Sequence, residues 1–186
     1  TIGPGRGLEQ AMRGCSAADI ETELHLRGRI DGSYREGLES LARQVAPKMK
    51  LTIHEPGPSA GMIDACRPFD IGLSLETGVN SNNRLVMSNK AFTYMLAGIT
   101  TIYSDTIAQR AFRDALGGRQ PIVALDDTAA FATILKTWDA DRASLLVSQQ
   151  DAWQWAKHRW HWEHDDERGR LLELFDEHLP KVARCA

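Results

Sequence analysis

The stretch "NKAFTYMLAGITTIYSD" (residues 89–105) decides the fold, because it joins a helix-forming segment to a β-branched strand through one glycine. Phe92, Met95 and Leu96 recur at helical spacing, and Gly98 suits the left-handed turn that commonly ends a helix. The "ITTIYS" that follows is rich in the β-branched and aromatic residues that strands prefer. We therefore predict a helix that ends at Gly98 and a buried strand directly after it.

The same alternation of β-rich runs and helical segments extends over most of the chain, which is typical of a doubly wound α/β domain. We expect strands in "IETELHLRGRI" (20–30), "KLTIHEP" (50–56), "FDIGLSLE" (69–76), 99–103 and 121–124. Other helices are expected in "GLEQAMRGC" (7–15), 33–46, near 60–66, 107–116 and 127–138. The predicted fold is α/β, a Rossmann-like doubly wound parallel sheet with helices on both faces.

Beyond Asp141 the pattern becomes helical only. Helices over 141–160 and 165–178 are expected to wrap the sheet, so we divide the chain into a sheet domain (1–140) and a helical extension (141–186). The first seven residues, "TIGPGRG", are similar to a strand end followed by a glycine-rich turn. We therefore expect the chain to begin inside a longer protein, whose upstream part contributes to any active site.

Composition narrows the classes of function. The 186 residues are 42% hydrophobic and 25% charged, and the net charge is −3. A slightly acidic chain argues against a general nucleic-acid or anionic-membrane binder, although a local anion pocket is compatible with it. No apolar run approaches the roughly 20 residues of a transmembrane helix, and no signal peptide is recognisable, so we expect a cytoplasmic protein. Cys15, Cys66 and Cys185 are too scattered for a disulfide framework or a paired metal motif, so we interpret them as reduced thiols.

The start of the helix in the opening stretch is a candidate anion site. Ser88 or Asn89 can cap it, and its free N–H groups and positive dipole end attract anions. Lys90 adds a mobile positive charge there. Ligands of open α/β sheets bind beyond the carboxyl ends of the strands, so we expect the polar loop "ETGVNSNNRLVMS" (76–88) to lie on the ligand. An ordinary capped helix after a surface loop would show the same local pattern.

Three stretches resemble the C-terminal, donor-binding half of GT-B fold glycosyltransferases, nucleotide-sugar enzymes with two Rossmann-like domains. They are "FDIGLSLE" (69–76), "SNKAFTYMLAGITTIYSD" (88–105) and "HWEHDDERGRLLELFDEHL" (161–179). In that family an acidic "D-I-G-L" strand precedes "K-x-F-E-Y-x-x-x-G-x-P-V-I-x-S-D". The resemblance covers most of the chain, from "GPGRGLE" onward. It implies transfer of a sugar from a nucleotide-diphosphate sugar to an acceptor, with residues 1–140 binding the donor.

The resemblance also implies roles for individual residues. The donor diphosphate would lie on the helix that starts near Ser88, Asn89 and Lys90. Glu76 matches an acid that faces the diphosphate or the donor sugar in many retaining members, which makes it the catalytic candidate. Arg6 resembles a basic residue that helps to neutralise the donor phosphates. A solvated loop carboxylate and an exposed surface arginine are the ordinary alternatives for Glu76 and Arg6.

The chain also departs from the family pattern. Thr93 stands where the family usually has a glutamate that holds the donor ribose, and Thr100 stands where it has proline. The loop "HEPGPSAG" (54–61) resembles the segment that borders the base, so His54, Glu55 and Ser59 are weaker candidates, with a tight turn as the alternative. No metal or other cofactor is expected, because GT-B members generally work without a divalent cation.

Two other classes of function stay open. One is a nucleotide-sugar epimerase of the same two-domain fold, and the other is a non-catalytic nucleotide- or sugar-binding module, which Thr93 favours. In the GT-B fold the acceptor is recognised by the N-terminal domain, so this half alone is expected to bind a donor without turning it over. The base, the sugar, the acceptor and the stereochemical outcome stay open.

Overall fold

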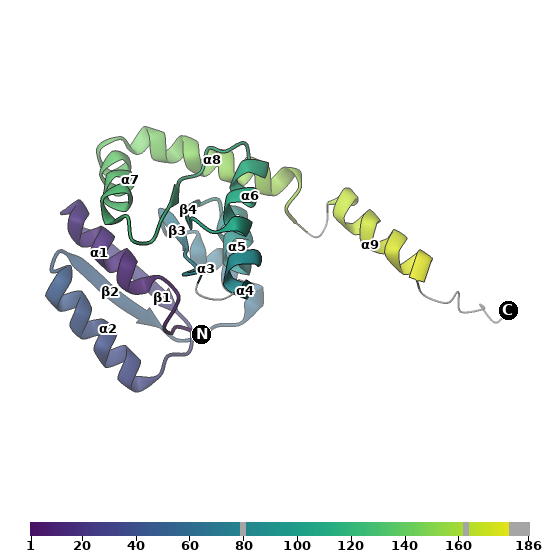
Figure 1. The fold of residues 1–186 in the computed structure, drawn as a ribbon. Coiled ribbons are helices and arrows are strands. Elements are labelled where there is room, and N and C mark those ends of the chain that lie inside the picture. Colours follow the sequence, from purple (N-terminus) through teal and green to yellow (C-terminus); the bar gives the residue numbers. More distant parts are fainter. Residues whose placement is uncertain (79–80, 162–163, 179–186) are drawn as a thin grey trace.

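The computed structural model describes residues 1–78, 81–161 and 164–178, which form an α/β protein (Figure 1). Its strands are β1 (Thr22–Arg27), β2 (Met49–His54), β3 (Ile71–Ser74), β4 (Thr100–Ser104) and β5 (Ile122–Val123). The helices before β4 are α1 (Leu8–Ala18), α2 (Gly32–Val45), the short 3₁₀ turn η1 (Ser59–Gly61), α3 (Met62–Cys66), α4 (Ser81–Leu85) and α5 (Asn89–Ala97). Those after β4 are α6 (Ile107–Ala115), α7 (Thr128–Ala140), α8 (Arg142–His158) and α9 (Asp165–His178).

All strand pairs are parallel, but they form two sheets. β1 pairs with β2, and β4 lies between β3 and β5. The α/β class is therefore confirmed, whereas the expected single sheet is replaced by one sheet of two strands and one of three. Within the described residues, β1 and β3 do not hydrogen-bond to one another, and β3 is an edge strand of the second sheet.

One hydrophobic core nevertheless joins the two sheets. Met12 of α1, Leu24 and Leu26 of β1, and Ile102 of β4 belong to the same buried cluster. Helix α1 packs against α7, and this contact is so close that a Cβ on Gly14 would lie 2.3 Å from the ring of Phe131. A second cluster packs α5, α6 and α8 against β4. The two sheets therefore belong to one packed body.

The loop expected between β3 and α5 contains a short helix that the sequence did not indicate. Residues 81–85 form α4, where the prediction was a polar loop over 76–88. The backbone N–H of Val86 donates to the carbonyl of Asn82, which closes this helical turn. Residues 79–80 of the same expected loop lie outside the described residues.

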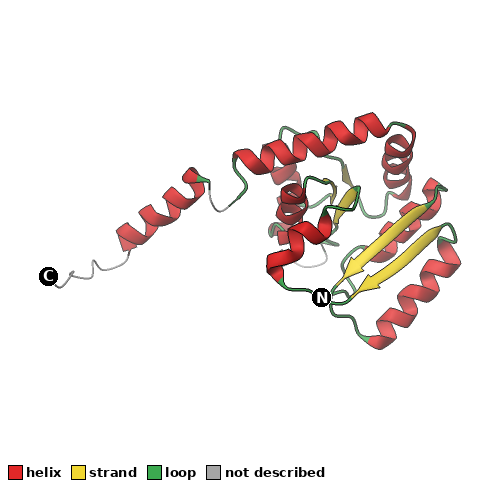
Figure 2. Cartoon of the chain, turned by 180° about the vertical axis from the view of Figure 1, so that it is seen from behind, coloured by secondary structure: helices red, strands yellow, loops and turns green. Residues whose placement is uncertain are grey.

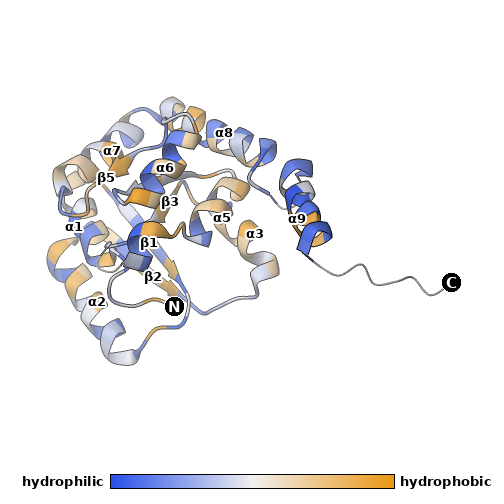
Figure 3. Cartoon of the chain, turned by 45° about the vertical axis from the view of Figure 1, so that its right-hand side comes forward, coloured by the Kyte–Doolittle hydropathy of each residue, from blue (hydrophilic) through white to orange (hydrophobic). Residues whose placement is uncertain are grey.

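Both C-terminal helices were expected to wrap the sheet, but only α8 packs against it. Helix α8 packs against α5 and β4, while α9 extends away from the sheets (Figure 1). Figure 3 shows α9 as largely hydrophilic, and its apolar side chains Leu172, Leu174 and Phe175 are exposed. Most residues of α9 are charged, so this helix offers little apolar surface to bury against the sheets. Residues 162–163 and 179–186 of the expected extension lie outside the described residues.

Candidate anion site

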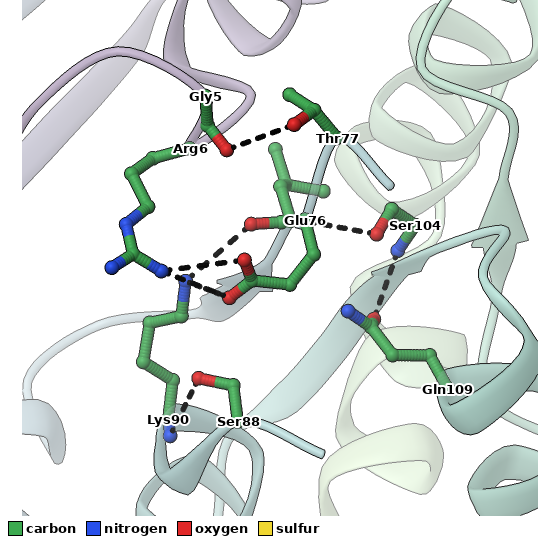
Figure 4. Close-up of polar contacts among 9 residues, drawn as sticks. Gly5, Arg6, Glu76, Thr77, Ser88, Lys90, Ser104 and Gln109 are labelled. Atoms are coloured by element: carbon green, nitrogen blue, oxygen red, sulfur yellow. Dashed lines mark hydrogen bonds and ion pairs between the residues drawn. The ribbon is translucent and has the colours of Figure 1, made fainter. Parts of the chain in front are cut away.

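Three charged side chains from distant parts of the chain meet beyond the carboxyl end of β3 (Figure 4). The guanidinium Nη1 of Arg6 lies 3.3 Å from Oε2 of Glu76, and the Nζ of Lys90 lies 3.3 Å from Oε1 of the same carboxylate. The structure thus brings together three of the residues predicted for catalysis and phosphate binding, which are Arg6, Glu76 and Lys90. Two cations around one carboxylate leave a formal excess of one positive charge.

Glu76 is held in place by the neighbouring strand. Its backbone N–H donates to the hydroxyl oxygen of Ser104, at 2.8 Å, and Ser104 ends β4. The backbone N–H of Ser104 in turn donates to Oε1 of Gln109 in α6, at 3.1 Å. The Glu76 side chain is only 5% exposed, so it is not the solvated loop carboxylate that was its ordinary alternative.

Arg6 reaches this carboxylate because a glycine-rich turn folds tightly against β3. Gly5 and Gly7 have φ angles of 77° and 68°, a left-handed conformation that favours glycine. A Cβ on Gly7 would lie 2.8 Å from the Cβ of Leu75, so the backbone approach also requires glycine. The hydroxyl of Thr77 donates to the carbonyl of Gly5 at 3.2 Å and ties the turn to the loop after β3.

Lys90 enters the site from the first turn of α5. Ser88 caps this helix, since its hydroxyl oxygen accepts a 3.4 Å hydrogen bond from the backbone N–H of Lys90. The Lys90 ammonium donates to the carbonyl of Leu75 at 3.5 Å as well as contacting Glu76. Burial lowers the pKa of Lys90, and Arg6 contributes in the same direction, whereas the Glu76 carboxylate raises this pKa and offsets part of the effect.

The remaining members of the predicted anion site lie on the same helix. Asn89 is the exposed first residue of α5. The hydroxyl of Thr93 donates to the carbonyl of Asn89 at 3.1 Å, which is the common back-bond of a threonine within a helix. The proton of the Thr93 hydroxyl, at the position where the family usually has a glutamate, is therefore already donated to the backbone.

The residues of the predicted base loop (54–61) contact other parts of the chain than Glu76 and Lys90 do. His54 ends β2, and its Nε2 lies 2.9 Å from Nδ1 of His25 on β1. The other ring nitrogen of His25 lies 2.9 Å from a carboxylate oxygen of Glu23. Glu55 and Ser59 are exposed, and the backbone carbonyl of Glu55 accepts a 3.4 Å hydrogen bond from Arg27. The structure thus places His54 in a Glu23–His25–His54 chain rather than in contact with Glu76.

Sequence reasoning missed the residues that support the site. Ser104 and Gln109 were not singled out, although Ser104 lies in the "S-D" that closes the quoted motif. The Glu23–His25–His54 chain was also missed. Its signal was the placement of two histidines on consecutive strands. Their proximity follows only from the pairing register, which sets His54 opposite Arg27, two residues after His25 on the same face of β1.

Two other kinds of feature are absent from the described ranges. No group of three or more His, Cys, Asp or Glu side chains there could hold a metal ion. Across residues 1–78, 81–161 and 164–178, no helix has the length and apolar character needed to cross a bilayer.

The chain matches no family model, and no curated protein matches it significantly.

Proposed function

We propose that this chain is the donor-binding half of a glycosyltransferase, which transfers a sugar from a nucleotide-diphosphate sugar to an acceptor. The proposal includes a Rossmann-like, doubly wound arrangement for residues 1–140 and a cytoplasmic location, both of which rest on the sequence. It also includes an N-terminal domain that binds the acceptor. Nucleic acid is not among the proposed partners.

The observation that carries the proposal is the position of Glu76 between Arg6 and Lys90. Both cations lie at the carboxyl edge of a parallel sheet, where ligands of α/β proteins bind, and Lys90 belongs to a helix N-terminus, which attracts phosphates. A nucleoside diphosphate leaving group gains negative charge as the sugar departs. Preorganised cations and N–H groups stabilise such charge in the transition state.

The two cations keep donors for a ligand. Contacts of Arg6 with described residues involve Nη1 only, and its side chain is 46% exposed. A guanidinium has five N–H donors and can bind phosphate oxygens in a fork. The arrangement therefore supports phosphate binding by Arg6 and Lys90 while Glu76 stays beside them to orient sugar hydroxyls.

Two other functions compete with this proposal. An epimerase of the same two-domain fold would use the same phosphate site. A binding module without turnover is favoured by one specific observation, the bond from the Thr93 hydroxyl to the carbonyl of Asn89. This hydroxyl can accept a hydrogen bond from a ribose but has no proton left to donate, and it lacks the charge of the family's glutamate.

A product assay with the full-length protein separates the three functions. Each nucleotide-diphosphate sugar of a panel is first tested for binding by thermal shift, since a ligand at 100 times its dissociation constant adds about 2.7 kcal/mol of stability. The donors that bind are then incubated with the protein and candidate acceptors. Transfer of the sugar supports the proposal, whereas an epimerised donor, or binding without any product, would replace it with one of the alternatives.

A further inference from the structure

One face of the sheet formed by β1 and β2 is polar. Leu24 and Leu26 of β1 belong to the core. Side chains alternate along a strand, so Glu23, His25 and Arg27 lie on the opposite face of β1. Figure 2 shows the two strands from this side, with α1 behind them. Parallel sheets are normally apolar on both faces, so charged and ionisable side chains gathered on one face indicate a binding site rather than a second core.

A chain of hydrogen bonds on this face fixes where the histidine protons lie. The hydrogen bond from His25 lowers the pKa of Glu23 and so favours its ionised form. An ionised carboxylate only accepts, so Nε2 of His25 carries the proton in the 2.9 Å contact with Glu23. Nδ1 of a neutral His25 is then an acceptor, to which Nε2 of His54 donates at 2.9 Å. His54 is therefore left with an unprotonated Nδ1.

The surroundings hold this chain in place and leave its end open. The His25 ring lies between the rings of His54 and Phe69, with centroids 5.2 Å and 4.6 Å away, and its side chain is only 20% exposed. Glu23 also pairs with Lys50 at 3.2 Å, which balances its charge. Nδ1 of His54 has no hydrogen-bond partner in the part of the chain that the structure describes. It faces away from His25, because the two nitrogens of an imidazole point in nearly opposite directions.

An arginine lies beside this histidine. The parallel register pairs Arg27 with His54, so the two side chains leave neighbouring strands on the same face. The Arg27 guanidinium donates to the carbonyl of Glu55, and a Cβ on Gly57 would lie 3.2 Å from its Nη1, so glycine leaves room for it against the loop. Among the described residues, no carboxylate forms an ion pair with Arg27. Most of its five N–H donors and its positive charge are therefore available to a ligand.

We propose that Arg27 and His54 bind an oxyanion that carries a proton, such as hydrogen phosphate. Arg27 donates to two oxygens of the anion as a fork, and the unprotonated Nδ1 of His54 accepts the hydrogen bond of the P–O–H group. Glu23 acts through His25, because the chain of hydrogen bonds holds the tautomer that leaves Nδ1 free. This inference does not depend on the proposed function, which rests on the candidate anion site.

The first measurement reads the histidine tautomers by ¹H–¹⁵N NMR of the imidazole rings in the whole chain, at about pH 8, where an ordinary histidine is neutral. We expect His25 and His54 both to carry their protons on Nε2. His158, which is exposed on α8, is the reference for a histidine in water. A proton on Nδ1 of His54 would overturn the proposal, because this nitrogen could not then accept the proton of the ligand.

The second measurement titrates the chain with inorganic phosphate and with sulfate, and follows the His54 ring nitrogens. Both anions are tetrahedral and doubly charged at about pH 8, but only phosphate keeps a proton to donate. We expect phosphate to bind at least about tenfold more tightly than sulfate, because a sulfate oxygen would face the lone pair of Nδ1 without a proton between them. Arg27→Gln should weaken phosphate binding at least about tenfold, and the exposed Arg43→Gln should not.

The readout at His54 separates this site from the candidate anion site. Lys90→Met is expected to leave the phosphate response of His54 unchanged, whatever it does to a nucleotide. The proposal would be overturned by His54 signals that phosphate does not move, by equal affinities for phosphate and sulfate, or by equal losses in Arg27→Gln and Arg43→Gln. The comparison of the two anions needs no substitution, so it decides the case even where a variant folds poorly.

Discussion

The Nζ of Lys90 lies 3.3 Å from Oε1 of Glu76, a side chain that is only 5% exposed. This contact influences the pKa of Lys90. Burial lowers the pKa of Lys90 below the ordinary lysine value of about 10.4, and the Glu76 carboxylate limits the decrease. The folded protein therefore holds this proton less tightly than the unfolded chain, so the contribution of Lys90 to stability rises with pH between its folded and unfolded pKa values.

We predict that Glu76→Gln lowers the pKa of Lys90 further. The substitution removes the carboxylate that favours the ammonium form and leaves burial and Arg6, which both oppose it. Lysine ammonium groups labelled with ¹³C-methyl and titrated by NMR give the midpoint directly. The control is Asp126→Asn, which removes an exposed carboxylate elsewhere. A Lys90 midpoint that stays the same or rises in Glu76→Gln would contradict the assigned interaction.

Ser104→Ala is expected to destabilise the protein by about 1–2 kcal/mol, because it leaves the buried backbone N–H of Glu76 without an acceptor. Chemical denaturation measures the free energy of unfolding. Ser40→Ala is the matched control, since the Ser40 hydroxyl accepts a hydrogen bond from the exposed Gln44 amide, and we expect its effect to stay within about 0.5 kcal/mol. Equal effects of the two substitutions would show that the Ser104 bond does not hold Glu76 in place.

Thr93→Glu should improve binding of a ribonucleoside diphosphate by roughly three- to tenfold. A carboxylate can accept hydrogen bonds from ribose hydroxyls, whereas the Thr93 hydroxyl already donates to the carbonyl of Asn89. Titration calorimetry with the ribonucleotide and with its dideoxy analogue tests this. A gain of the same size for both ligands would mean that the new carboxylate does not contact the ribose, and Thr93→Gln serves as the uncharged control.

Glu76→Gln in the full-length enzyme is expected to reduce turnover by at least about tenfold, equivalent to about 1.4 kcal/mol of transition-state stabilisation. The carboxylate would orient sugar hydroxyls and stabilise positive charge at the anomeric carbon. Because Glu76 is buried between two cations, we also expect a loss of about 1 kcal/mol of folding stability, limited by the water contact of Arg6 and Lys90. Assays well below the melting temperature separate the two effects. Unchanged turnover, as expected for Asp126→Asn, would remove Glu76 from the mechanism.

Local signals were sufficient to predict the elements that build the site. The helix that ends at Gly98 and the strand after it both form, because the helical spacing, the cap at Ser88 and the left-handed glycine all act within a few residues. The burial of Glu76 could not be predicted in the same way. It depends on Ser104 and Arg6, which lie far from Glu76 in the sequence and approach it only in the folded chain.

Long-range pairing explains the other differences. The sequence indicated the five strands but not that β1 and β3 would lie in different sheets, since pairing between distant strands leaves no local pattern. His54 contacts His25, because the parallel register sets His54 opposite Arg27, which lies two residues after His25 on the same face of β1. Its place beside a ligand stays a prediction. The helical pattern of α9 was read correctly, but its spacing carries no information about which surface it contacts.

The central claim is that the Lys90 end of α5 binds the phosphates of a nucleotide. The most direct test is calorimetric titration of the protein with a nucleoside diphosphate and with the matching nucleoside, before and after Lys90→Met. Lys136→Met is the control, because Lys136 is exposed on α7. We predict that Lys90→Met weakens diphosphate binding at least about tenfold, about 1.4 kcal/mol, and leaves nucleoside binding nearly unchanged. Equal losses for both ligands, or equal effects of Lys90→Met and Lys136→Met, would contradict the account.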